Sequence, residues 1–214
     1  MKHDYPSAHS GLKVHRTAAM TLLIAGLLSA CAAEKYKHEE AVQNKSAAAV
    51  AVITPAVITP AVRTDFDAAM THINAEDYDA GIELLVKVVK AVPTAPVPNI
   101  NLALAYEKTG KLKQAEESLQ QALGADADNP VANNELALLY RKTGRFVEAR
   151  QLYEKMLAKY PEYRIVHKNL GVLCDLYMKD YACALKHYEY YSGVVQDDKT
   201  VKSWIADLQK RSGK

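Results

Sequence analysis

The sequence predicts an all-α solenoid of about four helix-turn-helix units, closed by a C-terminal capping helix. The main observation is an internal repeat, because residues 96–129 and 130–163 match in register at a spacing of 34 residues. A fixed period of this size is typical of stacked repeat architectures. Two further observations agree. Prolines open both copies, where the first turn of a helix tolerates them, and a glycine lies where each helix pair must turn.

Overlaying the two copies shows which residue types recur. The matched positions are Leu102 and Leu136, Ala103 and Ala137, Tyr106 and Tyr140, Gly110 and Gly144, Ala115 and Ala149, and Leu123 and Leu157. This order of a small residue after Leu, an aromatic, a Gly turn and a small Ala resembles the tetratricopeptide repeat (TPR) family. The resemblance implies two antiparallel helices in each unit. Aromatic side chains would pack between the helices, and Ala would lie where they cross.

Extending the register in both directions predicts TPR repeats over residues 62–197, as units 62–95, 96–129, 130–163 and 164–197, with a capping helix and tail at 198–214. The first unit is the least regular, as terminal repeats usually are, and its first helix is expected at about residues 65–75. The fourth unit contains one extra residue, which we place in the hairpin loop before Tyr181. Trp204 lies on the apolar stripe of the capping helix.

The first 30 residues have the pattern of a secretory signal. Lys2, Lys13 and Arg16 precede an uncharged run at 17–30 that is too short to span a bilayer. The run ends at Leu28-Ser29-Ala30-Cys31, which resembles the lipobox of bacterial lipoproteins. That resemblance implies a signal peptide at 1–30 and lipid attachment at Cys31. It also implies an envelope location facing the periplasm, with Ala32 favouring the outer membrane. The alternative is an ordinary signal peptide with a chance cysteine.

Residues 31–61 are predicted to form a disordered tether rich in Ala, Val and Pro. The segment repeats Ala-Val-Ile-Thr-Pro at 51–55 and 56–60, and prolines at this spacing interrupt both helices and central strands. The tether therefore sets how far the repeats can lie from the membrane.

The TPR resemblance also implies where a protein partner binds, because the first helices of TPR units line a concave groove. The positions that match are Asn101, Leu104, Lys108, Asn134, Leu138, Arg141, Lys142, Lys168 and Val172. The apolar floor suits an amphipathic helix or an extended segment whose side chains enter pockets. The alternative is that these residues serve only the packing between repeats.

Cys174 and Cys183 flank the fourth hairpin and are predicted to form a disulfide if the chain is exported, the alternative being two buried thiols. No metal-ligand spacing, phosphate-binding loop or catalytic constellation stands out, so neither a metal, a cofactor, a small-molecule substrate nor enzymatic activity is expected. All but three of the 27 basic and all but one of the 25 acidic residues follow residue 30. That part is therefore neutral and lacks the basic footprint of nucleic-acid binding.

These features predict a lipid-anchored, non-catalytic scaffold or adaptor that assists an envelope complex. Such lipoproteins resemble the pilotins of type IV pili and secretion systems, accessories of outer-membrane assembly, and TPR partners of energy-transducing systems. A second hypothesis is a peptidoglycan-associated accessory that recruits or regulates wall enzymes. A third is an enzyme with a cryptic site.

Overall fold

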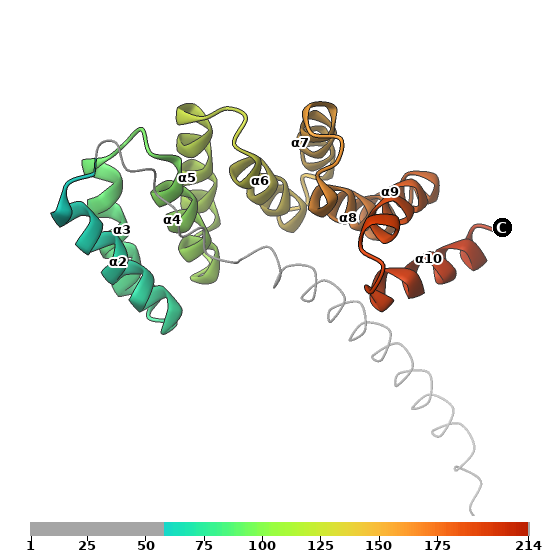
Figure 1. The fold of residues 1–214 in the computed structure, drawn as a ribbon, viewed down its shortest axis with the longest axis horizontal. Coiled ribbons are helices and arrows are strands. Elements are labelled where there is room, and N and C mark those ends of the chain that lie inside the picture. The colour runs from blue at the N-terminus through green and yellow to red at the C-terminus, as the bar shows by residue number, and fades with distance from the viewer. Residues whose placement is uncertain (1–57, 214) are drawn as a thin grey trace, which may run out of the picture. The chain divides into compact units, whose positions relative to one another are not determined.

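The computed structural model describes residues 58–213, which belong to one compact unit and are helical without strands. The signal peptide, Cys31 and residues 31–57 of the predicted tether lie outside the described residues. Successive helices form antiparallel hairpins that stack in chain order (Figure 1). The first three hairpins are α2 (Pro60–Asn74) with α3 (Tyr78–Ala91), α4 (Pro96–Lys108) with α5 (Leu112–Ala125), and α6 (Pro130–Lys142) with α7 (Phe146–Lys159). In the fourth hairpin, α8 (Arg164–Val172) continues into η2 (Leu173–Met178), and both pair with α9 (Tyr181–Val194). Helix α10 (Lys199–Arg211) follows.

The fold class is therefore the predicted one, but the first helix begins earlier than expected. Helix α2 starts at Pro60, so residues 60 and 61 belong to the helix and not to the tether. The Thr59 hydroxyl accepts a hydrogen bond from the Val62 backbone N–H at 3.3 Å. A proline at the first helical position loses no intrahelical hydrogen bond, so the residue that argued for a linker here opens a helix.

Each hairpin turns through one residue in the left-handed backbone region. These residues are Glu76, Gly110, Gly144 and Lys179, with φ of 61°, 74°, 81° and 57°. The two glycines were predicted for this role, because a residue without Cβ adopts positive φ at little cost. Glu76 and Lys179 hold the same conformation at a cost of about 1 kcal/mol each, and the stacked helices on either side impose it.

The extra residue of the fourth unit lies in a helix and not in the hairpin loop, which corrects the prediction. Residues 173–178 form a π-helix, whose i→i+5 hydrogen bonds accommodate one more residue than an α-helical turn. The loop that follows contains only Lys179 and Asp180 before α9 begins. The insertion therefore alters the first helix of the hairpin, and the left-handed turn that follows this helix is unchanged.

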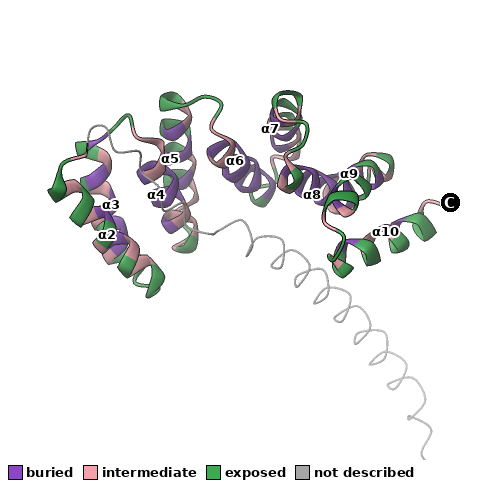
Figure 2. Cartoon of the chain, in the orientation of Figure 1, coloured by how far each residue is buried: buried purple, intermediate pink, exposed green. Residues whose placement is uncertain are grey.

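The core repeats with the sequence. Leu85, Leu119, Tyr153 and Tyr188 occupy the same place in the four second helices and are fully buried. Small residues at the helix crossings allow this packing, and Ala115, Ala149 and Ala184 are likewise inaccessible. Figure 2 shows buried residues along the inner side of every hairpin. The solenoid is thus one continuous core of stacked layers, in which each hairpin covers its neighbour.

Helix α10 covers the last hairpin as a cap. Val201 and Leu208 are fully buried, and the Trp204 ring lies 5.5 Å from the ring of Tyr188 between centroids. Asp198 begins the helix by accepting a hydrogen bond from the Val201 N–H at 3.2 Å. Among the helices of residues 58–213, none is both long and apolar enough to cross a bilayer.

Candidate functional site

The residues predicted to meet a partner lie on the first helices of units two to four. Asn101, Leu104 and Lys108 lie on α4, and Lys168 and Val172 lie on α8. The remaining four lie on α6: Asn134, Leu138, Arg141 and Lys142. Helices α4 and α6 pack against each other directly. The TPR register therefore brings these positions onto neighbouring inner helices.

Their accessibility divides them into two groups. Lys108 and Lys142 are exposed, and Leu104 is half-buried. The other six are at most 6% exposed: Asn101, Asn134, Leu138, Arg141, Lys168 and Val172. The accessible part of the predicted groove is therefore a rim of two lysines, which occupy the same position in consecutive units. The predicted apolar floor is covered at Leu138 and Val172.

Several of the buried polar groups join one unit to the next. The Asn169 side-chain amide donates to Asn134 Oδ1 at 2.8 Å and so connects α8 with α6. Lys168 pairs with Asp198 at 2.9 Å, with both side chains nearly inaccessible, and so connects α8 with the cap. Burial of a charged pair requires close hydrogen-bonded geometry, so these contacts specify how the units stack. In this structure, Lys168 therefore stabilises the docking of the cap and is not available to a partner.

Arg141 is the exception among these residues. It is 1% exposed, and within residues 58–213 its three guanidinium nitrogens have no hydrogen-bond partner. The positions equivalent to Arg141 in the neighbouring units hold the carboxylates Glu107 and Asp175. Each pairs with another cation: Glu107 with Lys142 at 3.4 Å, and Asp175 with Arg211 at 2.9 Å. The Arg141 guanidinium lies 5.8 Å from the Tyr177 ring. A buried guanidinium that makes no hydrogen bond is costly, so Arg141 is the side chain of this face with the largest unused hydrogen-bonding capacity.

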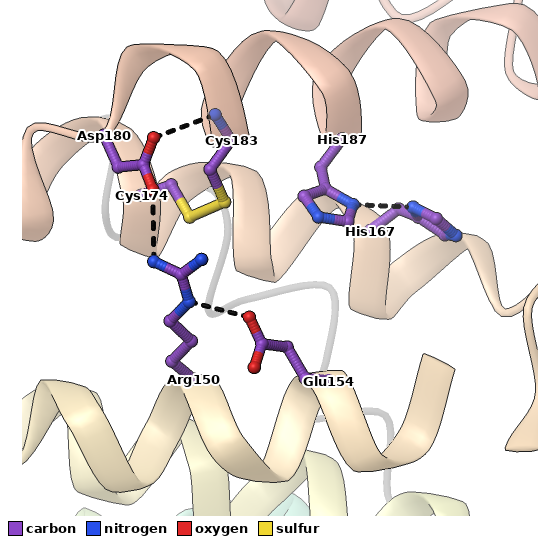
Figure 3. The surroundings of a disulfide bond; sticks show 7 residues. All are labelled: Arg150, Glu154, His167, Cys174, Asp180, Cys183 and His187. Atoms are coloured by element: carbon purple, nitrogen blue, oxygen red, sulfur yellow. Dashed lines mark hydrogen bonds and ion pairs between the residues drawn. A yellow bond between two sulfur atoms is a disulfide. The ribbon is translucent and has the colours of Figure 1, made fainter. Parts of the chain in front are cut away.

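The fourth hairpin holds a second concentration of chemically active side chains (Figure 3). Cys174 and Cys183 are joined by a disulfide with their Cα atoms 5.9 Å apart, which links η2 to α9. Asp180 accepts the Cys183 backbone N–H at 3.1 Å and also binds Arg150 of α7 at 3.1 Å. The backbone hydrogen bond and then the guanidinium lower the pKa of Asp180 against the opposing effect of burial. Arg150 also binds Glu154 at 2.7 Å.

A histidine pair that the sequence did not predict lies beside the disulfide. His167 Nδ1 and His187 Nδ1 lie 2.9 Å apart, and His167 Nε2 lies 2.9 Å from the Pro161 carbonyl oxygen. His187 follows Cys183 by one helical turn, which was the available sequence signal. Its counterpart on α8 could be known only once the two helices were packed together.

The same region contains a cleft of ≈ 640 Å³ between α7 and α9. Arg150, Glu154, Asp180, Cys183, Lys186 and His187 contribute its polar lining. Within the described part of the chain, Cys174, Asp180 and Cys183 also place their ligand-type atoms within 4.8 Å of one another. Because the two sulfurs are bonded to each other, this group does not offer the thiolates that a soft metal ion requires.

Comparison with known proteins agrees with this architecture. Residues 100–164 match the family model described as tetratricopeptide repeat. Similar solved structures include the MamA protein (TM-score 0.63, 20% identity, covering 71% of this chain and 82% of that one). A tetratricopeptide repeat protein from Parabacteroides merdae has a TM-score of 0.65 and 21% identity, with 72% and 61% covered. PilF of Pseudomonas aeruginosa has a TM-score of 0.64 and 23% identity, with 71% and 69% covered. Curated protein sequences give no significant match.

The stacked hairpins define an all-helical repeat solenoid, the fold that these solved structures share. Residues 100–164 carry the tetratricopeptide-repeat pattern that the sequence predicted, and the hairpins before and after them continue the same stack. The solved structures are less than 25% identical to this chain, so they show its fold alone.

Proposed function

We propose that this protein is a non-catalytic scaffold that is anchored by a lipid on Cys31, faces the periplasm and assists the assembly of an envelope complex. The TPR fold supports protein–protein interaction through the inner helices. The charged start, the apolar run and the Leu-Ser-Ala-Cys sequence support export and lipid attachment. One lipid-modified terminus with several acyl chains holds a protein stably on a membrane.

The observation that carries the binding surface is the basic rim of Lys108 and Lys142. These exposed side chains lie one repeat apart on adjacent inner helices, beside the half-buried Leu104. Behind the rim, the buried Arg141 guanidinium has no hydrogen-bond partner within residues 58–213. A partner segment with acidic side chains and an apolar contact for Leu104 fits this arrangement, because charge complementarity orients the encounter and apolar contact supplies affinity.

Partner capture from membranes tests this surface. We expect the double variant Lys108→Glu/Lys142→Glu to lose most cross-linked partner when the full-length protein is purified in mild detergent and analysed by mass spectrometry. Lys113→Glu is the matched control, because Lys113 is 91% exposed on the second helix α5. Equal capture by the rim variant and the control would place the partner on another surface. Recovery of wall hydrolases or synthases instead of assembly components would favour the peptidoglycan-associated alternative.

Fractionation tests the anchor separately. Cys31→Ser should move the protein from the membrane fraction to the soluble fraction, because the thioether to lipid requires the Cys31 sulfur. Cys183→Ser removes a different cysteine and should leave the protein on the membrane. Retention of the Cys31→Ser variant in washed membranes would contradict lipid attachment at this residue.

A further inference from the structure

We propose that the Cys174–Cys183 disulfide is a reversible redox site, at which the thiolate of a small thiol or of a dithiol oxidoreductase attacks Cys183 Sγ. The proposal goes beyond scaffolding, because it gives the fourth repeat a chemical input of its own. It depends on the surroundings of the two sulfurs, which differ sharply.

The disulfide has one accessible side. Cys174 is fully buried in η2, whereas Cys183 is half-buried and lines the cleft between α7 and α9. Exchange requires a thiolate to reach one sulfur of the bond, so access decides which sulfur reacts. Attack from solvent is therefore directed to Cys183, and Cys174 is the leaving group.

The cleft lining holds two cations and two carboxylates, and one of the cations lies one helical turn from Cys183. Lys186 is exposed and follows Cys183 by three residues, so the two share one face of α9. Arg150 contributes a second cation, but Asp180 and Glu154 already bind its guanidinium. Among the described residues that line the cleft, Lys186 is thus the cation outside these ion pairs, and we expect it to favour an anionic thiol such as glutathione.

The exchange balances without a further oxidant. The attacking thiol forms a new S–S bond to Cys183, the Cys174–Cys183 bond breaks, and its electron pair goes to Cys174. The proton of the attacking thiol passes through solvent to the Cys174 thiolate. A second thiol then attacks the mixed disulfide, leaves with the first thiol as a new disulfide, and frees the Cys183 thiol. Both cysteines are then reduced, and reoxidation reverses both steps.

Reduction would loosen one hairpin and leave the solenoid folded. The disulfide joins the start of the π-helix to the first turn of α9. Noncovalent contacts remain across the same pair of helices, including the His167–His187 hydrogen bond and the packing of Gly171 on Tyr188. The oxidised and reduced proteins thus share one fold, and the fourth hairpin is more constrained in the oxidised protein.

Thiol reactivity tests the asymmetry. In a Cys31→Ser background, Cys174→Ser leaves only Cys183, and Cys183→Ser leaves only Cys174. We expect Cys183 to react with a chromogenic disulfide reagent at least about tenfold faster than Cys174, after each rate is divided by its rate in denaturant. Equal rates, or faster reaction at Cys174, would overturn the proposal. Circular dichroism of both variants shows whether the native fold persists, and the next experiment needs neither variant.

Reduction of the oxidised protein tests the chemistry directly. Glutathione should produce a mixed disulfide on Cys183, seen by peptide mass spectrometry after acid quenching, at a rate well above that of global unfolding. Lys186→Glu should slow glutathione several-fold more than it slows uncharged 2-mercaptoethanol, whereas Lys113→Glu should change neither. Absence of the disulfide from protein purified from the envelope, reduction only on unfolding, or a mixed disulfide on Cys174 would each refute the proposal.

Discussion

His167 and His187 share a hydrogen bond of 2.9 Å between their Nδ1 atoms, which joins α8 to α9 beside the disulfide. Because the Pro161 carbonyl can only accept, His167 Nε2 carries a proton and donates to it. Between the two Nδ1 atoms, one must carry a proton and donate while the other accepts. Protonation of both rings would remove this arrangement, since both Nδ1 atoms would then carry protons.

The pair predicts a loss of stability in mild acid. Burial, and then the charge of His167, lower the pKa of His187 to about 4. In the unfolded chain it titrates near pH 6.5, so protons bind the unfolded state first. The free energy of unfolding should be level above about pH 6.5 and should fall towards pH 4, by up to about 3 kcal/mol.

Thermal melts between pH 7.5 and pH 4.5 check this expectation. His187→Gln should flatten the profile. Most of the lost stability should appear above pH 5, and we assign that loss to His187. Asp180 has a lowered pKa and therefore keeps its contribution to stability until the pH falls below about 4. A wild-type profile that is flat down to pH 4.5 would contradict the prediction.

Gly171 permits the close approach of α8 and α9. A Cβ at this position would lie 2.5 Å from Tyr188 Cδ1, and the Tyr188 ring is fully buried. Gly171→Ala should therefore reduce the free energy of unfolding by about 1–3 kcal/mol. Gly193→Ala on α9 is the control, because nothing lies within 4 Å of its added Cβ. That change should stabilise by about 0.5–1 kcal/mol. Denaturant unfolding that ranks the two variants equally would contradict this packing.

The non-glycine hairpin turn offers a test of backbone strain. Lys179 holds φ of 57° at the position where Gly144 holds 81°. Lys179→Gly should raise the free energy of unfolding by about 0.5–1 kcal/mol, and Gly144→Ala should lower it by about 1 kcal/mol. Chemical denaturation monitored by circular dichroism measures both. A stabilising Gly144→Ala substitution would be incompatible with the left-handed turn.

Asp198 attaches the cap through two side-chain interactions besides its helix-capping role. It pairs with Lys168 at 2.9 Å and accepts the Tyr191 hydroxyl at 3.2 Å. Asp198→Ala should cost about 2–5 kcal/mol, because it leaves Lys168 buried without an anion. The chain has one tryptophan, so the emission of Trp204 reports on the cap alone. It should shift to longer wavelength in this variant, whereas Asp197→Ala should leave it near wild type. An unshifted spectrum would show that α10 docks without Asp198.

The sequence also suggests Leu138→Glu as a probe of the groove, but Leu138 is only 6% exposed. A carboxylate there would be buried without a partner and would destabilise the fold, so lost binding could not be ascribed to the groove. The rim lysines avoid this difficulty. Periodicity predicts which helix face a residue occupies, whereas accessibility depends on everything packed against that face.

The repeat register determined the helix pairs, the small residues at their crossings, the glycine turns and the cap, because each follows from local spacing and residue type. Tertiary structure decided the rest. It placed the extra residue of unit four in a π-helix. It left the Arg141 guanidinium without a hydrogen bond in the described part of the chain, although each adjacent unit has a carboxylate at the equivalent position. It also paired His167 with His187 and exposed one sulfur of the disulfide to a cleft. These outcomes depend on distances between helices, which are set by side-chain volumes and hydrogen-bond geometry across the stack and not by a period along the chain.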